Sequence, residues 1–169
     1  MQRFEPYLDT CILLSLLVPD SGSSAALQWF SEREDQPIWL SHWTWLEFTG
    51  VLALCCRRGD LSSERLRMIH QEAESFRRER LSLVEVVSAD FLRAQAWLQQ
   101  QPHTPLRSGD ALHLAIAQRT QLRLHTADQQ LLNVAAALNL SDLVQAVRPP
   151  PQQRSPARPA SRSSSSAGS

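Results

Sequence analysis

The sequence contains no lysine, so all 17 of its basic residues are arginines. This absence excludes a Walker-type phosphate loop, a Schiff-base lysine and a Ser–Lys catalytic pair. The three cysteines (Cys11, Cys55 and Cys56) form neither a disulfide framework nor a zinc-binding spacing, which suits a reducing compartment. No apolar run is long enough to cross a membrane, and residues 1–20 lack the pattern of a signal peptide. We therefore expect a cytoplasmic protein without a membrane role.

Charge is unevenly distributed along the 169 residues. Residues 148–169 contain four arginines and no acid, which leaves 13 arginines against all 17 acidic residues in residues 1–147, a net charge of −4. The sequence therefore lacks a globally basic surface, and any polyanionic partner must be bound locally or through a metal ion. Residues 149–169 are rich in Pro, Arg, Ser and Gln, a composition typical of disorder. We expect one domain over residues 1–147 and a disordered tail over 148–169.

Short apolar strands alternate with amphipathic helices along the rest of the chain. The predicted strands cover residues 4–8, 37–41, 83–87, 122–125 and 143–147. The predicted helices cover 12–17, 21–33, 44 to about 58, 60 or 62 to about 80, 88 to about 101, a buried segment from 108, and a segment from about 128. This alternation predicts an α/β fold, with a central parallel sheet of about five strands and helices on both faces.

Four acidic residues stand just after a predicted strand or in the first turn of a predicted helix: Asp9, Glu47, Asp110 and Asp128. Taken singly, the last three have a structural explanation. Glu47 fits a capping box that begins at Thr44, and Asp110 and Asp128 lie where a helix dipole favours an acid by about 0.3–1 kcal/mol. Asp9 has no such explanation.

Taken together, the four acids point to a metal site. Parallel strands end at one edge of a sheet, where ligands bind in open α/β folds. Two carboxylates about 4 Å apart repel by roughly 4 kcal/mol at an effective dielectric of about 20, so four require protonation or a cation. An all-oxygen ligand set favours Mg²⁺ or Mn²⁺, whose matching chemistry is phosphodiester hydrolysis.

The motifs around these acids resemble those of PIN-domain ribonucleases, and most closely the VapC-type toxins of bacterial toxin–antitoxin pairs. The resemblance covers about residues 7–147. It depends on Tyr7-Leu8-Asp9-Thr10, on Glu47, on Ser108-Gly109-Asp110-Ala111-Leu112-His113-Leu114-Ala115 and on Thr126-Ala127-Asp128.

The resemblance implies a metal-dependent endoribonuclease that is inhibited by a cognate antitoxin and forms a homodimer. By it, the four acids are the catalytic groups and the ligands of Mg²⁺ or Mn²⁺, and Thr10 and Thr126 orient water or the carboxylates. Some PIN proteins carry a fifth acid two positions after the last one, where this chain has Gln130.

Several side chains outside the acidic set are further candidates for site residues. Arg57 and Arg58 begin an arginine-rich stretch that a solvated helical hairpin explains, although they could also contact RNA phosphates. We expect His113 and His125 to be packed or hydrogen-bonded near the site, rather than metal ligands or general bases.

Three other functions stay open. The first is a catalytically silent PIN-like module that binds RNA or protein. The second is a housekeeping RNA-processing nuclease without an antitoxin. The third is a phosphotransfer enzyme with Asp9 as its nucleophile, for which the chain lacks the expected lysine.

Overall fold

The computed structural model describes residues 4–148 and contains one five-stranded sheet in the order β3-β2-β1-β4-β5. Every neighbouring pair of strands is parallel, so all five carboxyl ends lie at the same edge. The strands are β1 (Pro6–Leu8), β2 (Ile38–Ser41), β3 (Leu81–Val84), β4 (Arg123–Thr126) and β5 (Val144–Ala146). The predicted α/β fold is confirmed.

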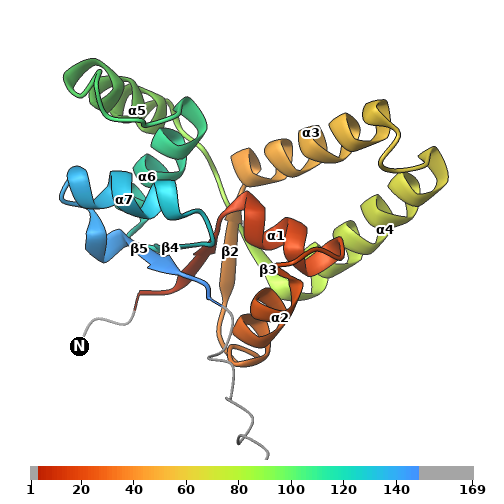
Figure 1. Cartoon of the computed structure of the whole chain (residues 1–169). Coiled ribbons are helices and arrows are strands. Elements are labelled where there is room, and N and C mark those ends of the chain that lie inside the picture. The colour runs from red at the N-terminus through yellow and green to blue at the C-terminus, as the bar shows by residue number, and fades with distance from the viewer. Residues whose placement is uncertain (1–3, 149–169) are drawn as a thin grey trace, which may run out of the picture.

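Helices cover both faces of the sheet (Figure 1). They are α1 (Thr10–Leu17), α2 (Ser23–Ser31), α3 (His42–Arg58), α4 (Ser63–Arg80), α5 (Ser88–Gln100), α6 (Ser108–Thr120) and α7 (Gln129–Ala137), with a 3₁₀ turn, η1 (Ser141–Leu143), before β5. Helices α5, α6 and α7 pack on one face, and α1 to α4 pack on the other.

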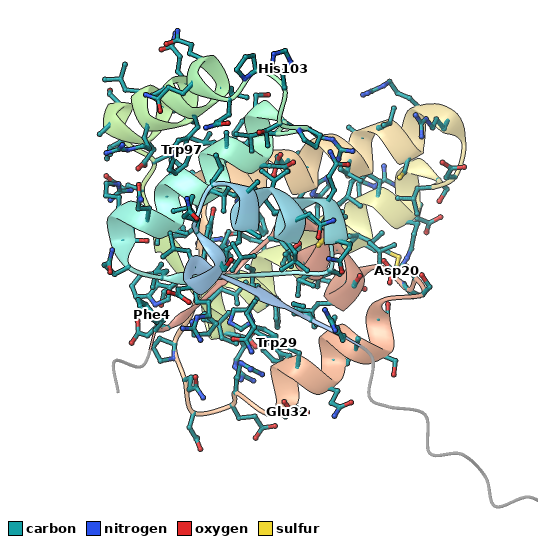
Figure 2. All side chains as sticks on the ribbon, turned by 60° about the vertical axis from the view of Figure 1, so that its left-hand side comes forward. Phe4, Asp20, Trp29, Glu32, Trp97 and His103 are labelled. Carbon is teal, nitrogen blue, oxygen red and sulfur yellow. The ribbon has the colours of Figure 1, made fainter. Side chains whose placement is uncertain are left out.

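Alternation along β1 explains why the two faces have separate cores. Tyr7 belongs to the cluster under α5, α6 and α7, whereas Leu8 packs with Ile12 and Trp29 under α1 and α2. Figure 2 shows Trp29 between α2 and the strands, where its indole N–H donates to Nδ1 of His125 at 2.9 Å. The central strand is therefore covered on both sides, as is usual for parallel sheets.

Most element boundaries differ by one to three residues from the sequence-based expectation, and those at the starts of α3 and β3 have a clear physical reason. Helix α3 begins at His42, because the Ser41 hydroxyl accepts from the Thr44 amide and the Thr44 hydroxyl accepts from the Ser41 amide. Strand β3 begins at Leu81, two residues earlier than expected, because α4 runs directly into it after Arg80. Neither difference moves an acidic residue away from the carboxyl edge of the sheet.

Within residues 4–148, no helix is long and apolar enough to cross a membrane. The predicted disorder of the tail concerns residues that, apart from Arg148, lie outside the described part of the chain.

Candidate active site

The carboxyl edge of the sheet brings together side chains from four helices. Asp9 directly follows the central strand β1 and precedes α1, and its amide donates to the carbonyl of His125 in β4. Asp128 follows β4 in the same way. Helix α6 returns through a short turn into β4, so the first turn of α6, with Asp110, lies at the same edge.

Asp9 is buried and is held by neighbouring side chains. Its Oδ2 accepts hydrogen bonds from the Thr126 hydroxyl and from the Cys11 thiol (3.2 Å). Burial and the charge of Asp9 raise the pKa of Cys11 to about 12, so the thiol stays protonated and donates. Among the described residues, Oδ1 of Asp9 accepts no hydrogen bond and lies 3.8 Å from Nε2 of His113.

Glu47 makes two short hydrogen bonds through a single oxygen. Its Oε2 lies 2.6 Å from the Thr10 hydroxyl, which donates to it, and 2.7 Å from Nε2 of His113. Burial alone would raise the pKa of Glu47, but the bonds from His113 and Thr10 and the charge of His113 lower it overall. The capping-box explanation of Glu47 is wrong, because Ser41 and Thr44 form that box.

The other oxygen of Glu47 lies over Gly109. A Cβ atom added at Gly109 would stand 2.7 Å from Oε1 of Glu47, closer than real Cβ contacts allow. Gly109 therefore leaves the space that Glu47 occupies beside Asp110. Sequence reasoning missed this role, because a glycine in the first turn of a helix carries no sign of its tertiary neighbour.

Asp110 differs from the other three acids in having a buried oxygen, Oδ2, with no hydrogen-bond partner among the described residues. Burial raises the pKa of Asp110, and the negative charges of Asp9 and Asp128 raise it further. An uncompensated buried oxygen is costly, which indicates that this position serves a purpose other than stability. Asp110 lies in the first turn of α6, as the helix-dipole explanation requires, but that explanation does not account for the buried oxygen without a partner.

Asp128 caps α7, as its local sequence suggests. Its Oδ1 accepts from the amides of Gln130 (2.7 Å) and Leu131 (3.3 Å), while Oδ2 lies 3.9 Å from the Arg107 guanidinium. Gln130 accepts from Arg107 at 3.2 Å and donates to the Pro105 carbonyl at 2.8 Å. Gln130 thus ties the loop before α6 to α7.

Across residues 4–148, no group of three or more His, Cys, Asp or Glu side chains is arranged so that it could hold a metal ion as it stands. The donors nevertheless fit a hard divalent cation in their chemistry. In this part of the chain Oδ2 of Asp110 has no hydrogen-bond partner, and Oδ1 of Asp9 has only His113 at 3.8 Å. Burial and then the charges of Asp9 and Asp128 raise the pKa of Asp110, and a cation would favour its ionised form. Glu47 and Asp128 each accept protein hydrogen bonds through one carboxylate oxygen, which leaves the second oxygen for a cation.

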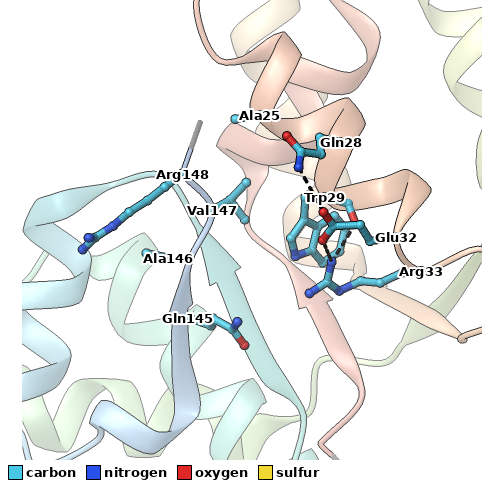
Figure 3. A pocket seen from close by; sticks show the side chains of 9 residues that line it. All are labelled: Ala25, Gln28, Trp29, Glu32, Arg33, Gln145, Ala146, Val147 and Arg148. Atoms are coloured by element: carbon cyan, nitrogen blue, oxygen red, sulfur yellow. Dashed lines mark hydrogen bonds and ion pairs between the residues drawn. The ribbon is translucent and has the colours of Figure 1, made fainter. Parts of the chain in front are cut away.

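The structure does not bring the remaining candidates into the acidic pocket. Arg57 and Arg58 are exposed in the last turn of α3, about 15 Å along the helix axis from Glu47. His125 faces Trp29 on the α2 side of the sheet. A pocket of about 380 Å³ between α2 and the end of β5 is lined by Trp29, Arg33 and Arg148, but by none of the four acids (Figure 3).

The fold and this edge define the protein as an α/β protein with a cluster of acidic side chains at the carboxyl ends of a parallel sheet. The model of the PIN domain family matches residues 7–137, which include all four acids. The chain therefore belongs to the PIN-domain family. No curated relative matches the sequence significantly.

Solved structures with the same fold share little sequence with this chain. The VapC20 toxin of Mycobacterium tuberculosis, described as cleaving the sarcin-ricin loop, is 15% identical, with a TM-score of 0.61 over 79% of this chain and 95% of its own. DNA-bound VapBC from Salmonella typhimurium is 14% identical, with a TM-score of 0.65 over 86% of this chain and 100% of its own. FitAcB from Neisseria gonorrhoeae is 21% identical, with a TM-score of 0.59 over 85% and 96%.

Proposed function

We propose that this protein is a metal-dependent endoribonuclease, with Asp9, Glu47, Asp110 and Asp128 as its catalytic acids and the ligands of Mg²⁺ or Mn²⁺. The observation that carries the proposal is the buried, unpartnered Oδ2 of Asp110, which shares its pocket with the charges of Asp9 and Asp128. An acid held in this way is destabilising in the empty protein and favourable beside a cation.

In the proposed reaction, a water attacks the phosphorus of an RNA phosphodiester and displaces the sugar oxygen. The bound divalent ion supplies Lewis acidity to the phosphate and to the attacking water. Thr126 and Thr10 donate to Asp9 and Glu47, so each carboxylate keeps its other oxygen for the reacting groups. Arg107 lies beside Asp128 at the exposed rim, where its guanidinium suits a substrate phosphate.

We further propose that the protein is the toxin of a toxin–antitoxin pair, with a cognate antitoxin as its partner. The support is structural similarity to toxin–antitoxin complexes from Klebsiella pneumoniae, Rickettsia felis and Salmonella typhimurium. A neighbouring reading frame for a small DNA-binding protein would support this role. Its absence would favour the housekeeping RNA-processing nuclease.

A homodimer is part of the same proposal. Large apolar side chains are exposed on α3 and on or just before α5, namely Leu46, Val51, Val87, Phe91 and Leu92. If two copies pair through α3 and α5, these side chains leave water, which favours association. Light scattering of the purified protein should give twice the monomer mass of 19.1 kDa, and Leu46→Glu should reduce it to that of the monomer.

The central test is cleavage of total cellular RNA by the purified protein, with and without Mg²⁺. We expect cleavage only with the metal, and its loss in Asp9→Asn and Asp110→Asn, two nearly isosteric changes that should leave the fold intact. Asp60→Asn, at an exposed site after α3, is the matched control and should cleave like the unaltered protein. Cleavage without metal, or full activity in Asp9→Asn, would contradict the proposal.

Two further experiments concern RNA binding by this protein. RNA binding without cleavage under any condition would identify a silent PIN-like module. If Arg57 or Arg58 contacts RNA, its replacement by alanine should weaken binding and make it less sensitive to salt, without a change in the rate at saturation.

A further inference from the structure

A chain of buried hydrogen bonds runs from the central strand to Glu47. The Tyr7 hydroxyl, fully buried in β1, lies 2.8 Å from Oγ of Ser41 and 2.7 Å from Nδ1 of His113. The other ring nitrogen of His113, Nε2, lies 2.7 Å from Oε2 of Glu47. The chain therefore links the end of β2, strand β1 and helix α6 to a carboxylate on α3.

The direction of the last bond follows from the chemistry of its partners. Oε2 of Glu47 already accepts a hydrogen bond from the Thr10 hydroxyl at 2.6 Å, and a carboxylate oxygen accepts from its ring partner as well. Nε2 of His113 therefore carries a hydrogen and donates, whether the ring is neutral or charged. In the neutral ring, Nδ1 accepts from the Tyr7 hydroxyl, which fixes the tautomer that donates to Glu47.

This arrangement is unusual for the place it occupies. Tyr7 and His113 lie in the apolar core beneath α6, next to Leu112, Leu114 and Ala115. Apolar side chains of similar volume would pack there without the cost of removing polar groups from water. Both side chains have hydrogen-bond partners: the Tyr7 hydroxyl bonds to His113, and His113 bonds to Glu47. Oδ1 of Asp9 lies 3.8 Å from the same ring nitrogen of His113.

We propose that Tyr7 and His113 are positioning residues that hold the Glu47 carboxylate with Oε2 turned to the protein and Oε1 left for the metal. The proposal rests on the proposed function, since it assigns Glu47 to that metal site. Thr10 holds Oε2 from the opposite side at 2.6 Å, and Gly109 leaves the space into which Oε1 projects. Partners that orient a ligand in this way are typically worth 10- to 100-fold in metal affinity or activity.

The experiment measures Mn²⁺ binding by electron paramagnetic resonance, together with kcat and KM on an RNA oligonucleotide. Tyr7→Phe removes one hydroxyl without a change of shape, and we expect about tenfold weaker Mn²⁺ binding and a lower kcat with an unchanged KM. His113→Leu should do the same, whereas His113→Gln, which retains an N–H donor near the Nε2 position, should recover part of the loss. Thr120→Val, which removes a backbone-directed hydroxyl from the same helix, is the control and should alter neither.

A double substitution separates positioning from a general structural effect. If Tyr7 acts through Glu47, Tyr7→Phe should have no further effect on Mn²⁺ affinity in a Glu47→Gln background. A structural effect would lower the affinity equally in both backgrounds and would overturn the proposal. Equal Mn²⁺ affinity of Tyr7→Phe and the unaltered protein would also overturn it.

The two proposals fail in different ways. Mn²⁺ binding that depends on Tyr7, without RNA cleavage by the unaltered protein, would refute the nuclease and leave the positioning role supported. Cleavage that is indifferent to Tyr7 and His113 would refute the positioning role alone. Failure of the unaltered protein to bind Mn²⁺ would overturn both, since Glu47 would then have no metal to be positioned for.

Discussion

Replacement of Gly109 by alanine tests the geometry of the acidic pocket without removing any polar group. Gly109 lies in the first turn of α6, and alanine is favoured over glycine inside a helix by about 1 kcal/mol. On helix propensity alone, Gly109→Ala should stabilise the protein. The added Cβ, however, would stand 2.7 Å from Oε1 of Glu47.

The cost of relieving that contact follows from how Glu47 is held. Its carboxylate can move away only by stretching or breaking the bonds to Thr10 and His113, at 2.6 and 2.7 Å. A hydrogen bond to a charged group contributes about 1.5–3 kcal/mol, so the loss of one outweighs the gain in helix propensity. We expect Gly109→Ala to lower the free energy of unfolding by about 1 kcal/mol and to abolish most RNA cleavage.

A double-mutant cycle measured by urea denaturation isolates this contact. In a Glu47→Ala background the obstacle is gone, so Gly109→Ala should change sign and stabilise by up to about 1 kcal/mol. Gly50→Ala is the matched control, because Gly50 is an exposed glycine within α3 and an added Cβ would meet nothing within 4 Å. It should stabilise by a similar amount in both backgrounds.

Additivity would refute this reasoning. If Gly109→Ala has the same effect with and without the Glu47 side chain, the two residues do not compete for space. Glu47 would then not be held with Oε1 over Gly109, and the proposal that His113 positions Glu47 would lose its geometric support.

Three further predictions concern the stability of the fold. Burial and two nearby arginines lower the pKa of His125 from 6.5 to about 3, so His125 is protonated more readily in the unfolded state than in the folded state. The free energy of unfolding should therefore fall as the pH drops from 6.5 toward 3, and it should be about 2 kcal/mol lower at pH 5 than at pH 7.5. His125→Gln should remove that part of the pH dependence in urea titrations at pH 7.5 and 5, and an identical pH dependence would contradict it. Asp90→Asn should cost about 2–3 kcal/mol, because the buried Asp90 accepts from Arg119 at 2.7 and 2.9 Å and caps α5; an unchanged melting temperature would argue against this. Phe48→Ala, in the core between α1, α3 and α4, should cost about 3–5 kcal/mol by the same denaturation assay, whereas a loss below 1 kcal/mol would mean that the core collapses around it.

The sequence predicted the sheet and its acidic edge because both follow from local patterns. Apolar sequence stretches of four or five residues between amphipathic helices specify a parallel sheet. Asp9 stands directly after β1, and Asp128 stands two residues after β4. The start of a helix at about residue 128 could be predicted from Thr126-Ala127-Asp128 alone, and the structure confirms it. The start of β3 could not be predicted, because α4 runs directly into this strand and no turn residue marks the boundary.

The sequence could not predict how Glu47 is held, because its partners are distant along the chain. Thr10 lies 37 residues before it and His113 lies 66 residues after it. The local sequence predicts a capping box from Thr44 to Glu47. In the structure the box runs from Ser41 to Thr44, three residues earlier, and leaves Glu47 out. Tyr7 belongs to the motif Tyr7-Leu8-Asp9-Thr10, but nothing in its sequence neighbours indicates that its hydroxyl bonds to the His113 ring.

The four acids are constrained to different degrees, and the differences bear on how the pocket works. Asp9 and Glu47 each have one oxygen held by two side-chain donors, and Asp128 has one oxygen held by the amides of its own helix. Asp110 has a buried oxygen that no described group satisfies, and it bears the repulsion of two of the other acids. Three of the acids are therefore fixed by the protein, while the fourth gains most from an external positive charge. If the proposed metal ion binds here, we expect the removal of Asp110 to weaken its binding more than the removal of any of the other three acids, and we expect the ion to stabilise the fold on binding.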